Sequence, residues 1–279
     1  ILFAACGCAQ VAFMTAARAA VQPLFAPPYG APEEAAVQLR QAGFALLSGG
    51  DLARWIGATK LQLQELARDW DDLPPDNYLL DGGHYRSRRH GCFEVQAGTW
   101  APVPHRAHWQ PVEYNALHGG IERWFEPMAQ HTLAQPAWHA LLTGLGGLCD
   151  AVFAPNGEAP RWYVESHQFR IDTASGIGRP TPEGAHRDGV DLVAVILVAR
   201  DAIKGGETRI FEAASPAGQR FTLTEPWSAL LLDDARMVHE TTPIQPLSAA
   251  QPSGAGGHRD TLVLTWRRGS FQGPILGAP

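Results

Sequence analysis

The chain has 279 residues, of which 45% are hydrophobic and 18% are charged. A sequence of this size and composition can bury a substantial core, so we predict a globular protein. The formal net charge of −6 and the lack of a basic block argue against a nucleic-acid partner. No run of 18 apolar residues occurs, so the sequence predicts no transmembrane helix and no membrane partner.

The four cysteines are Cys6, Cys8, Cys92 and Cys149. Their spacing fits no zinc site, so we expect reduced thiols and a cytoplasmic protein. The apolar stretch 1–13 is similar to the hydrophobic part of a signal peptide, but no charged residue precedes it. We interpret it as an extension upstream of the native start, for which Met14 is a candidate.

The N-terminal half is predicted to be mostly helical. Pro32, followed by two glutamates, fits the first turn of a helix, and Gly43 fits its end. Asp51 fits the N-cap of the next helix. The elements predicted here are helix 32–42, strand 44–47, helix 51–70, strand 84–95, helix 121–133 and helix 137–152.

The C-terminal half changes to short strands separated by Gly- and Pro-rich turns. We predict strands at 162–171, 185–198, 207–211, 220–223, 229–232, 237–244 and 259–267. Strands at this spacing favour a sandwich or jelly roll over βαβ units. The predicted fold is α+β and a single domain, 1–279. It has an N-terminal arm at 1–30, mainly helical support with a few strands at 31–160, and a β-core at 161–268.

His186-Arg187-Asp188, with His239 far downstream, is the strongest chemical signal. Two imidazoles and one carboxylate make the facial triad of non-haem Fe(II) oxygenases, which leaves three metal positions open. Because residues i and i+2 of a strand share a face, His186 and Asp188 are predicted to point inward together, with Arg187 outward. The three open positions have room for a bidentate cosubstrate and O₂.

Arg259 supplies a partner for such a cosubstrate. An Fe(II) ion with one carboxylate ligand keeps a net positive charge and can chelate a 2-oxo acid. The far carboxylate of 2-oxoglutarate then needs a cation, and a guanidinium can bind it with two hydrogen bonds. Thr261 follows at i+2, so its hydroxyl is predicted to share that face.

Several less specific interpretations compete with this one. A lone His-x-Asp is most often an ordinary polar pair, and the tripeptide recurs at His258-Arg259-Asp260 with Arg259 predicted inward. His105 and His108 are a rival metal pair, but two prolines place them in a loop. His-Arg-Asp also occurs in protein kinases, whose other motifs are missing here. Six further histidines are interpreted as surface or packing residues: His84, His90, His118, His131, His139 and His167.

Four segments together resemble one bacterial family. They are 181–191, 205–208, 233–244 and 259–264, and the similarity extends over about 163–266. The sequence resembles the 2-oxoglutarate/Fe(II)-dependent dioxygenases of the isoleucine 4-hydroxylase, or free L-amino-acid hydroxylase, type. The resemblance implies a double-stranded β-helix (cupin-like) core at 161–268, with His186, Asp188 and His239 as iron ligands and Arg259 as the 2-oxoglutarate anchor.

This resemblance implies hydroxylation, or sulfoxidation, of a small molecule, with Fe(II), 2-oxoglutarate and O₂ as cofactor and cosubstrates. For a free L-amino acid, Gln168, Arg170 and Arg86 are the candidate substrate-binding residues. The sequence leaves open whether the protein forms a homodimer. Two alternatives also remain open: a cupin-like metalloenzyme that does not use 2-oxoglutarate, and a non-catalytic stress- or biofilm-related binding protein on the same fold.

Overall fold

The computed structural model describes residues 25–248 and 256–274. The apolar segment 1–13 and most of the predicted arm 1–30 lie outside these residues. Within the described part of the chain, every helix is too short or too polar to span a membrane.

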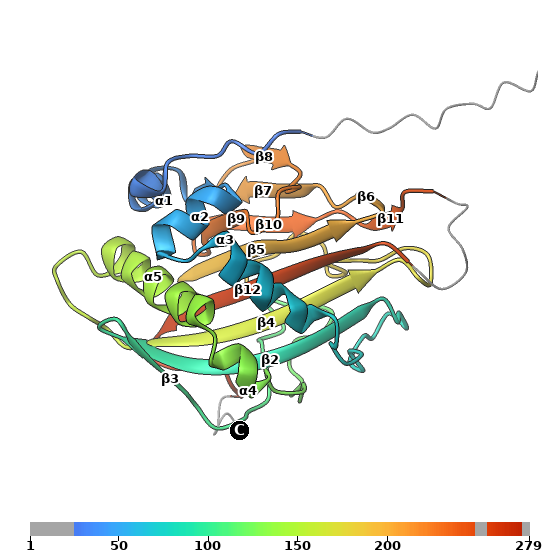
Figure 1. The fold of residues 1–279 in the computed structure, drawn as a ribbon, viewed down its shortest axis with the longest axis horizontal. Helices are drawn as coiled ribbons and strands as arrows, with labels where there is room; N and C mark the ends of the chain where they lie inside the picture. Colours follow the sequence, from blue (N-terminus) through green and yellow to red (C-terminus); the bar gives the residue numbers. More distant parts are fainter. Residues whose placement is uncertain (1–24, 249–255, 275–279) are drawn as a thin grey trace, which may run out of the picture.

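A long antiparallel sheet of seven strands forms the frame of the molecule (Figure 1). Its strands, in spatial order, are β1 (Phe44–Leu47), β9 (Ala229–Asp233), β5 (Leu192–Asp201), β12 (His258–Arg268), β4 (Trp162–Asp172), β2 (Arg86–Gln96) and β3 (Thr99–Pro102). The C-terminal β-core is therefore extended by three strands from the N-terminal half. The central strands β12 and β4 pair along their whole length of eleven residues, which gives the sheet a rigid middle.

Two smaller sheets cover part of one face of the long sheet. They consist of β10 (Met237–Thr241), β7 (Thr208–Glu212) and β8 (Gly218–Phe221), and of β11 (Ile244–Pro246) and β6 (Ile203–Gly205). Ile210 and Phe221 of the three-stranded sheet pack on Val193, Leu197 and Leu230 of the long sheet. Two antiparallel sheets joined by an apolar layer make the predicted jelly-roll fold.

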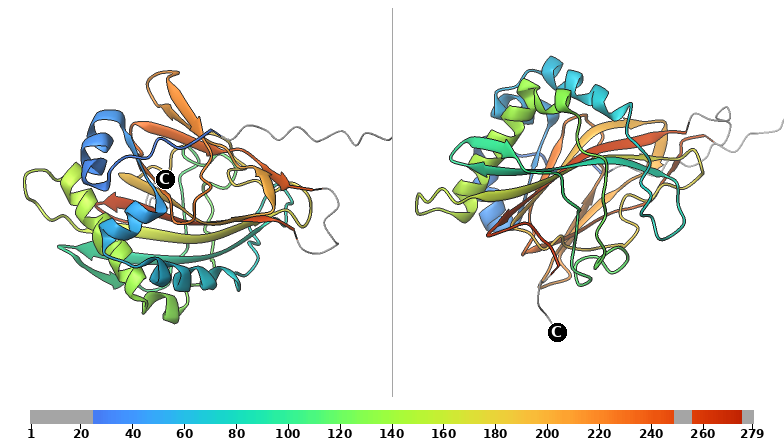
Figure 2. Two further views of the ribbon diagram at one scale, coloured as in Figure 1. Left: turned by 45° about the horizontal axis from the view of Figure 1, so that its top comes forward. Right: turned by 90° about the horizontal axis from the view of Figure 1, so that it is seen from below.

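Helices cover the opposite face of the long sheet (Figures 1 and 2). They are α1 (Ala35–Ala42), α2 (Gly49–Ile56), α3 (Lys60–Ala67), α4 (Gln130–Leu133) and α5 (Pro136–Phe153). Trp138 and Leu145 of α5 belong to the same buried cluster as Val164 of β4 and Leu264 of β12. The even-numbered residues of these two strands therefore face the helices, and the odd-numbered residues face the other way.

The predicted helix 51–70 is wrong, because the segment forms two helices and a 3-10 turn. The first begins at Gly49, where the Ser48 hydroxyl accepts a hydrogen bond from the Asp51 amide, so Ser48 and not Asp51 is the N-cap. It ends at Gly57, whose φ of 73° is left-handed. Thr59 and Gln62 then form a capping box that starts α3.

The predicted helix 121–133 is also wrong, since only Gln130–Leu133 is helical. Residues 103–129 form a long connection on the side of the sheet opposite the helices (Figure 2, right, green). Arg123 makes a β-bridge with His108, and Pro127 makes one with His90. These pairings take the place of the predicted helix. The bridge between Pro127 and His90 holds the end of the connection against β2.

Candidate functional site

The structure brings His186, Asp188 and His239 together, as the sequence predicted. One ligand atom from each lies within 4.8 Å of the other two. The Nε2 atoms of His186 and His239 lie 3.8 and 3.9 Å from the two oxygens of Asp188. All three residues are at least partly buried, so their ligand atoms converge at one point in the interior.

The support of these side chains differs from the prediction of a strand over 185–198. Strand β5 begins only at Leu192, so His186 and Asp188 lie in the loop before it. His186 is held by an isolated antiparallel bridge to His239 of β10. The carboxylate of Asp234 accepts hydrogen bonds from the backbone amides of Asp188 and the next two residues, which fixes the loop.

The hydrogen bonding of His186 and the charge state of His239 suit metal binding. The Nδ1 atom of His186 lies 3.0 Å from the Gly184 carbonyl, so Nδ1–H donates there and Nε2 keeps its lone pair. Burial, with His186 nearby, lowers the pKa of His239 well below its usual value, so its ring is neutral. Burial opposes the charged form of His186, but the carboxylates of Asp188 and Glu183 raise its pKa overall.

Asp188 is oriented by a chain of amide hydrogen bonds. The Gln110 side chain donates to Asp188 Oδ1 at 3.1 Å. The side-chain oxygen of Gln110 in turn accepts from Asn115 and Arg123, at 3.1 and 3.0 Å. The side-chain nitrogen is therefore the end that faces Asp188. Outer hydrogen bonds of this kind hold metal-ligating carboxylates in place. No local pattern in the sequence indicates a role for Gln110, because the residue lies on the irregular connection 103–129.

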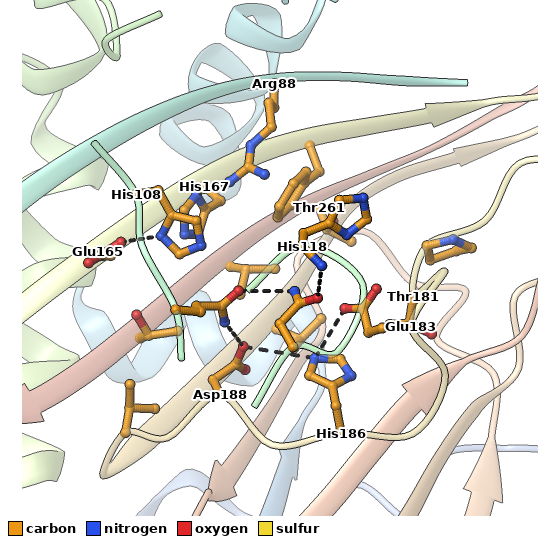
Figure 3. A pocket seen from close by; sticks show the side chains of 18 of the residues that line it. Arg88, His108, His118, Glu165, His167, Thr181, Glu183, His186, Asp188 and Thr261 are labelled. Atoms are coloured by element: carbon orange, nitrogen blue, oxygen red, sulfur yellow. Dashed lines mark hydrogen bonds and ion pairs between the residues drawn. The ribbon is translucent and has the colours of Figure 1, made fainter. Parts of the chain in front are cut away.

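These residues line a cavity between the long sheet and the loops that cover it, with a volume of about 130 Å³. Figure 3 shows His186, Asp188 and Glu183 on one wall and Arg88, His108 and His167 on the opposite wall. The odd-numbered residues of β4 and β12 line the cavity between them.

Arg259 and Thr261 lie on this cavity face of β12, as predicted. Arg259 is only 3% exposed, and its Nη2 atom has no hydrogen-bond partner in the described protein. Burial and the neighbouring Arg200 lower the pKa of Arg259 to about 10, so it is positively charged at neutral pH. A buried guanidinium with free N–H groups can accept a carboxylate ligand.

Of the three candidate substrate-binding residues, only Arg86 lines the cavity. Gln168 and Arg170 lie on the helix-facing side of β4, where Arg170 donates two hydrogen bonds to the Asp260 carboxylate. Their predicted contact with substrate does not fit this geometry. Both faces of β4 are covered, so the strand has no polar and apolar alternation from which the inward face could be read.

Sequence analysis missed a second polar cluster on the far wall, formed by His90, His108, Glu165 and His167. Their ligand atoms also lie within 4.8 Å of one another. Glu165 Oε2 accepts from His108 Nδ1 at 2.5 Å and from His90 Nε2 at 3.1 Å, and Arg88 donates to His167 Nδ1 at 2.6 Å. The Arg88 cation beside His167 disfavours a metal ion here. The alternating Glu165-x-His167 on β4 was the available signal.

A family model described as 2OG-Fe dioxygenase matches residues 67–265. The chain belongs to the 2OG-Fe dioxygenase family. Among curated proteins no significant match was found. A solved bsmA homolog from Methylobium petroleophilum PM1 is 50% identical, with a TM-score of 0.82 over 90% of this chain and 98% of that chain.

Two more distant structures share the fold. IDO from Bacillus thuringiensis is 18% identical, with a TM-score of 0.67 over 85% of this chain and 99% of that one. The Fe(II)/α-ketoglutarate-dependent dioxygenase TqaL is 20% identical, with a TM-score of 0.63 over 86% of this chain and 90% of that one. At these identities the likeness shows a common architecture only.

Members of the 2OG-Fe dioxygenase family use Fe(II), 2-oxoglutarate and O₂, so this chain is an oxidoreductase with these requirements. The residues present fit that chemistry. Two imidazoles and a carboxylate are the donor set that non-haem Fe(II) enzymes use, and the unpartnered guanidinium of Arg259 lies in the same cavity. Family membership favours an enzyme over the non-catalytic alternative, and 2-oxoglutarate use over a cupin-like enzyme that lacks it.

Proposed function

We propose that this dioxygenase hydroxylates, or sulfoxidises, a free L-amino acid, as enzymes of the isoleucine 4-hydroxylase type do. The observation that carries the proposal is one small cavity that contains a His-Asp-His triad together with separate, buried, positively charged groups. A free amino acid brings a carboxylate that needs such a cation. We also propose a cytoplasmic location, which the free, buried thiols of Cys92 and Cys149 support.

In this proposal His186, Asp188 and His239 bind the iron. Arg259 binds the 5-carboxylate of 2-oxoglutarate, and Thr261 adds a hydroxyl from the next inward position of β12. With these cofactors bound, O₂ is consumed, 2-oxoglutarate is converted to succinate and CO₂, and one oxygen atom is transferred to the substrate. The protein contributes orientation and a fixed charge for each carboxylate.

The dimensions of the cavity support a small substrate. A cavity volume of about 130 Å³ suits a small molecule. Both ligands together need some movement of the covering segments, such as the connection 103–129. The walls carry cations and carboxylates in addition to apolar side chains, as a zwitterion requires.

A succinate-release assay over the free L-amino acids, with short peptides as a second class, tests the proposal. We expect succinate with a few apolar L-amino acids and none with peptides. The chain offers a matched pair of variants, because His186→Ala and His258→Ala change the first residue of the two His-Arg-Asp copies. Only His186→Ala should abolish succinate release, since His258 lies outside the cavity.

The outcomes separate the parts of the proposal. Turnover with peptides alone would exclude the free amino acid and leave the dioxygenase intact. Full activity of His186→Ala would exclude that residue as an iron ligand. Binding of 2-oxoglutarate to the Fe(II) protein, observed as a visible charge-transfer band, provides a second readout that needs no substrate.

A further inference from the structure

The long sheet places two buried arginines in one row of the cavity wall. Arg86 of β2 and Arg259 of β12 are both paired with Ile171 of β4, one from each side. Because neighbouring strands are about 4.8 Å apart, the two backbones lie roughly 10 Å from each other. Both side chains line the cavity, so it has two separate places for a carboxylate.

The arginine at the second place has spare hydrogen-bonding capacity. Arg86 donates from Nε to Asp76 at 2.7 Å, but its Nη2 atom is buried and has no partner in the described protein. Arg123 also lines the cavity, and its Nε atom is likewise buried and unpartnered. Buried N–H groups without partners are costly, so the site favours a ligand that accepts their hydrogen bonds.

Arg88 is less available than Arg86 and Arg123. Its guanidinium lies over the ring of Phe125 at 3.6 Å and over that of Phe169 at 4.4 Å. It also donates to His167 at 2.6 Å. These contacts hold Arg88 as part of the cavity wall.

The carboxylate with spare capacity is Glu183. Among the described residues that line the cavity, only Glu183 has a buried carboxylate oxygen without a hydrogen-bond partner, Oε2. Its other oxygen lies 3.6 Å from His186 Nε2, next to the proposed iron position. The turn that carries Glu183 is tied to β10, because the Thr181 hydroxyl donates to the Thr241 carbonyl and accepts from the Thr241 amide.

Glu165 is the other glutamate of the cavity, and its hydrogen-bonding capacity is already used. Its Oε2 atom accepts from His90 and His108. Its Oε1 atom lies 3.6 Å from a guanidinium nitrogen of Arg106. An ammonium group would have to displace these partners, which Glu183 does not require.

We propose that Glu183 binds the ammonium group of the substrate, and that Arg86 with Arg123 binds its carboxylate. This inference rests on the proposed function, because it assumes that the substrate is a free amino acid. It assigns the two anion sites of one row to different ligands: Arg259 to 2-oxoglutarate and Arg86 to the amino acid. An amino acid lacking either charged group would leave one buried partner unsatisfied and bind weakly.

The test compares the amino acid that gives most succinate with its N-acetyl and carboxamide derivatives. Binding is followed by the change in the charge-transfer band of the anaerobic Fe(II)–2-oxoglutarate protein, and succinate formation is measured separately. Glu183→Gln should weaken binding of the amino acid by about 10- to 100-fold and leave the N-acetyl derivative unchanged. Arg86→Gln should weaken the amino acid similarly and leave the carboxamide unchanged.

Further variants guard against misfolding and a structural role. Arg86→Gln removes the hydrogen bond to Asp76 and leaves Arg88, at 3.7 Å, as the one described cation beside that carboxylate. The double variant Asp76→Asn/Arg86→Gln should therefore show the same selectivity with less loss of stability. Recovery of binding in Glu183→Asp would support a direct contact. All variants should keep the wild-type affinity for 2-oxoglutarate.

Three results would overturn the inference while leaving the proposed function in place. They are an unchanged preference for the amino acid over both derivatives, loss of Fe(II) binding in Glu183→Gln, and weaker 2-oxoglutarate binding in Arg86→Gln. The second would make Glu183 a metal ligand, and the third would move the cosubstrate to Arg86. If no free amino acid binds or is turned over by the wild-type protein, the proposed function itself fails.

Discussion

His186 and His239 exchange both backbone hydrogen bonds of an isolated antiparallel bridge, with N–O distances of 3.0 and 2.9 Å. Their ring centroids lie 4.6 Å apart. Because main-chain atoms make the bridge, the two positions stay together when a side chain is changed. The proposed metal site is therefore set by the closure of the jelly roll, which joins the loop before β5 to β10.

Loss of one imidazole should remove metal binding and keep the fold. We expect Mn(II), a redox-stable substitute for Fe(II), to raise the melting temperature of the wild-type protein, because binding at 100 times Kd adds about 2.7 kcal/mol. EDTA should reverse the rise. His239→Ala should melt near the metal-free wild type and show no response to Mn(II), whereas His258→Ala should respond fully. Equal responses of the two variants would exclude His239 as a ligand.

The two His-Arg-Asp copies also offer a pair of arginine variants. Arg259 is buried in the cavity, whereas Arg187 is half-buried, does not line the cavity and donates to the Ala235 carbonyl. Arg259→Ala should raise the Kd for 2-oxoglutarate by about 30- to 1,000-fold, since truncating one partner of a buried charge pair costs roughly 2–4 kcal/mol. Arg187→Ala should change it less than about threefold. Titration of the charge-transfer band measures both constants, and similar values would place the anchor elsewhere.

Gln110 should act on the metal through Asp188. Removing its hydrogen bond frees the carboxylate to rotate, and loss of such outer partners typically lowers metal affinity by about 10- to 100-fold. We expect this loss for Gln110→Ala in calorimetric titrations with Mn(II). The control is Gln96→Ala, whose exposed amide donates to the Ala159 carbonyl away from the cavity. Wild-type affinity in Gln110→Ala would show that the amide only fills space.

Acid should destabilise the protein through His108. Burial lowers its pKa to about 4, although Glu165 opposes that shift and Arg123 and His90 add to it. The native ring stays neutral while the unfolded ring gains a proton below pH 6.5. Stability from this residue is therefore complete above about pH 6.5 and is lost as the pH falls towards 4, a change on the order of 3 kcal/mol.

Urea denaturation between pH 4.5 and 7.5 measures this loss. His108→Gln should reduce the pH dependence, because glutamine can still donate to Glu165 but does not titrate in this range, whereas buried histidines such as His239 continue to contribute. His131→Gln is the matched control for the substitution itself, because it replaces an exposed histidine outside the cavity. Identical curves for the wild type and His108→Gln would show that His108 is not the titrating group.

The proposed metal triad and the proposed cosubstrate arginine could be predicted from the sequence, because each of their residues lies in a short motif within or just before a strand. His186 and Asp188 were correctly grouped, although they lie in a loop and not on the predicted strand. The sequence does not show which face of β4 points into the cavity. Its two faces are both buried, one against helices and one against the cavity, so Gln168 and Arg170 looked as suitable as Glu165 and His167.

Contacts between distant segments account for the rest. Gln110 and Arg123 belong to the connection 103–129, which has no regular pattern and was partly assigned to a helix. Its position depends on the bridge from Pro127 to His90 of β2 and on the hydrogen bond to Asp188. Such pairings are decided by tertiary structure, so local propensity could not predict them. Glu183, by contrast, lies within the motif segment 181–191. Its role is indicated only by the unpartnered carboxylate oxygen in the structure.

The split of the predicted helix 51–70 depends on Gly57, and this can be tested against a second glycine. An added Cβ would meet no atom within 4 Å at either Gly57 or Gly147, so only the backbone differs. Gly57 has a left-handed φ of 73°, whereas Gly147 lies inside α5. Gly57→Ala should lower the free energy of unfolding by about 1 kcal/mol, and Gly147→Ala should raise it by about 0.5–1 kcal/mol. Urea denaturation measures both, and a stabilised Gly57→Ala would mean that α2 and α3 can join into the single helix that the sequence suggested.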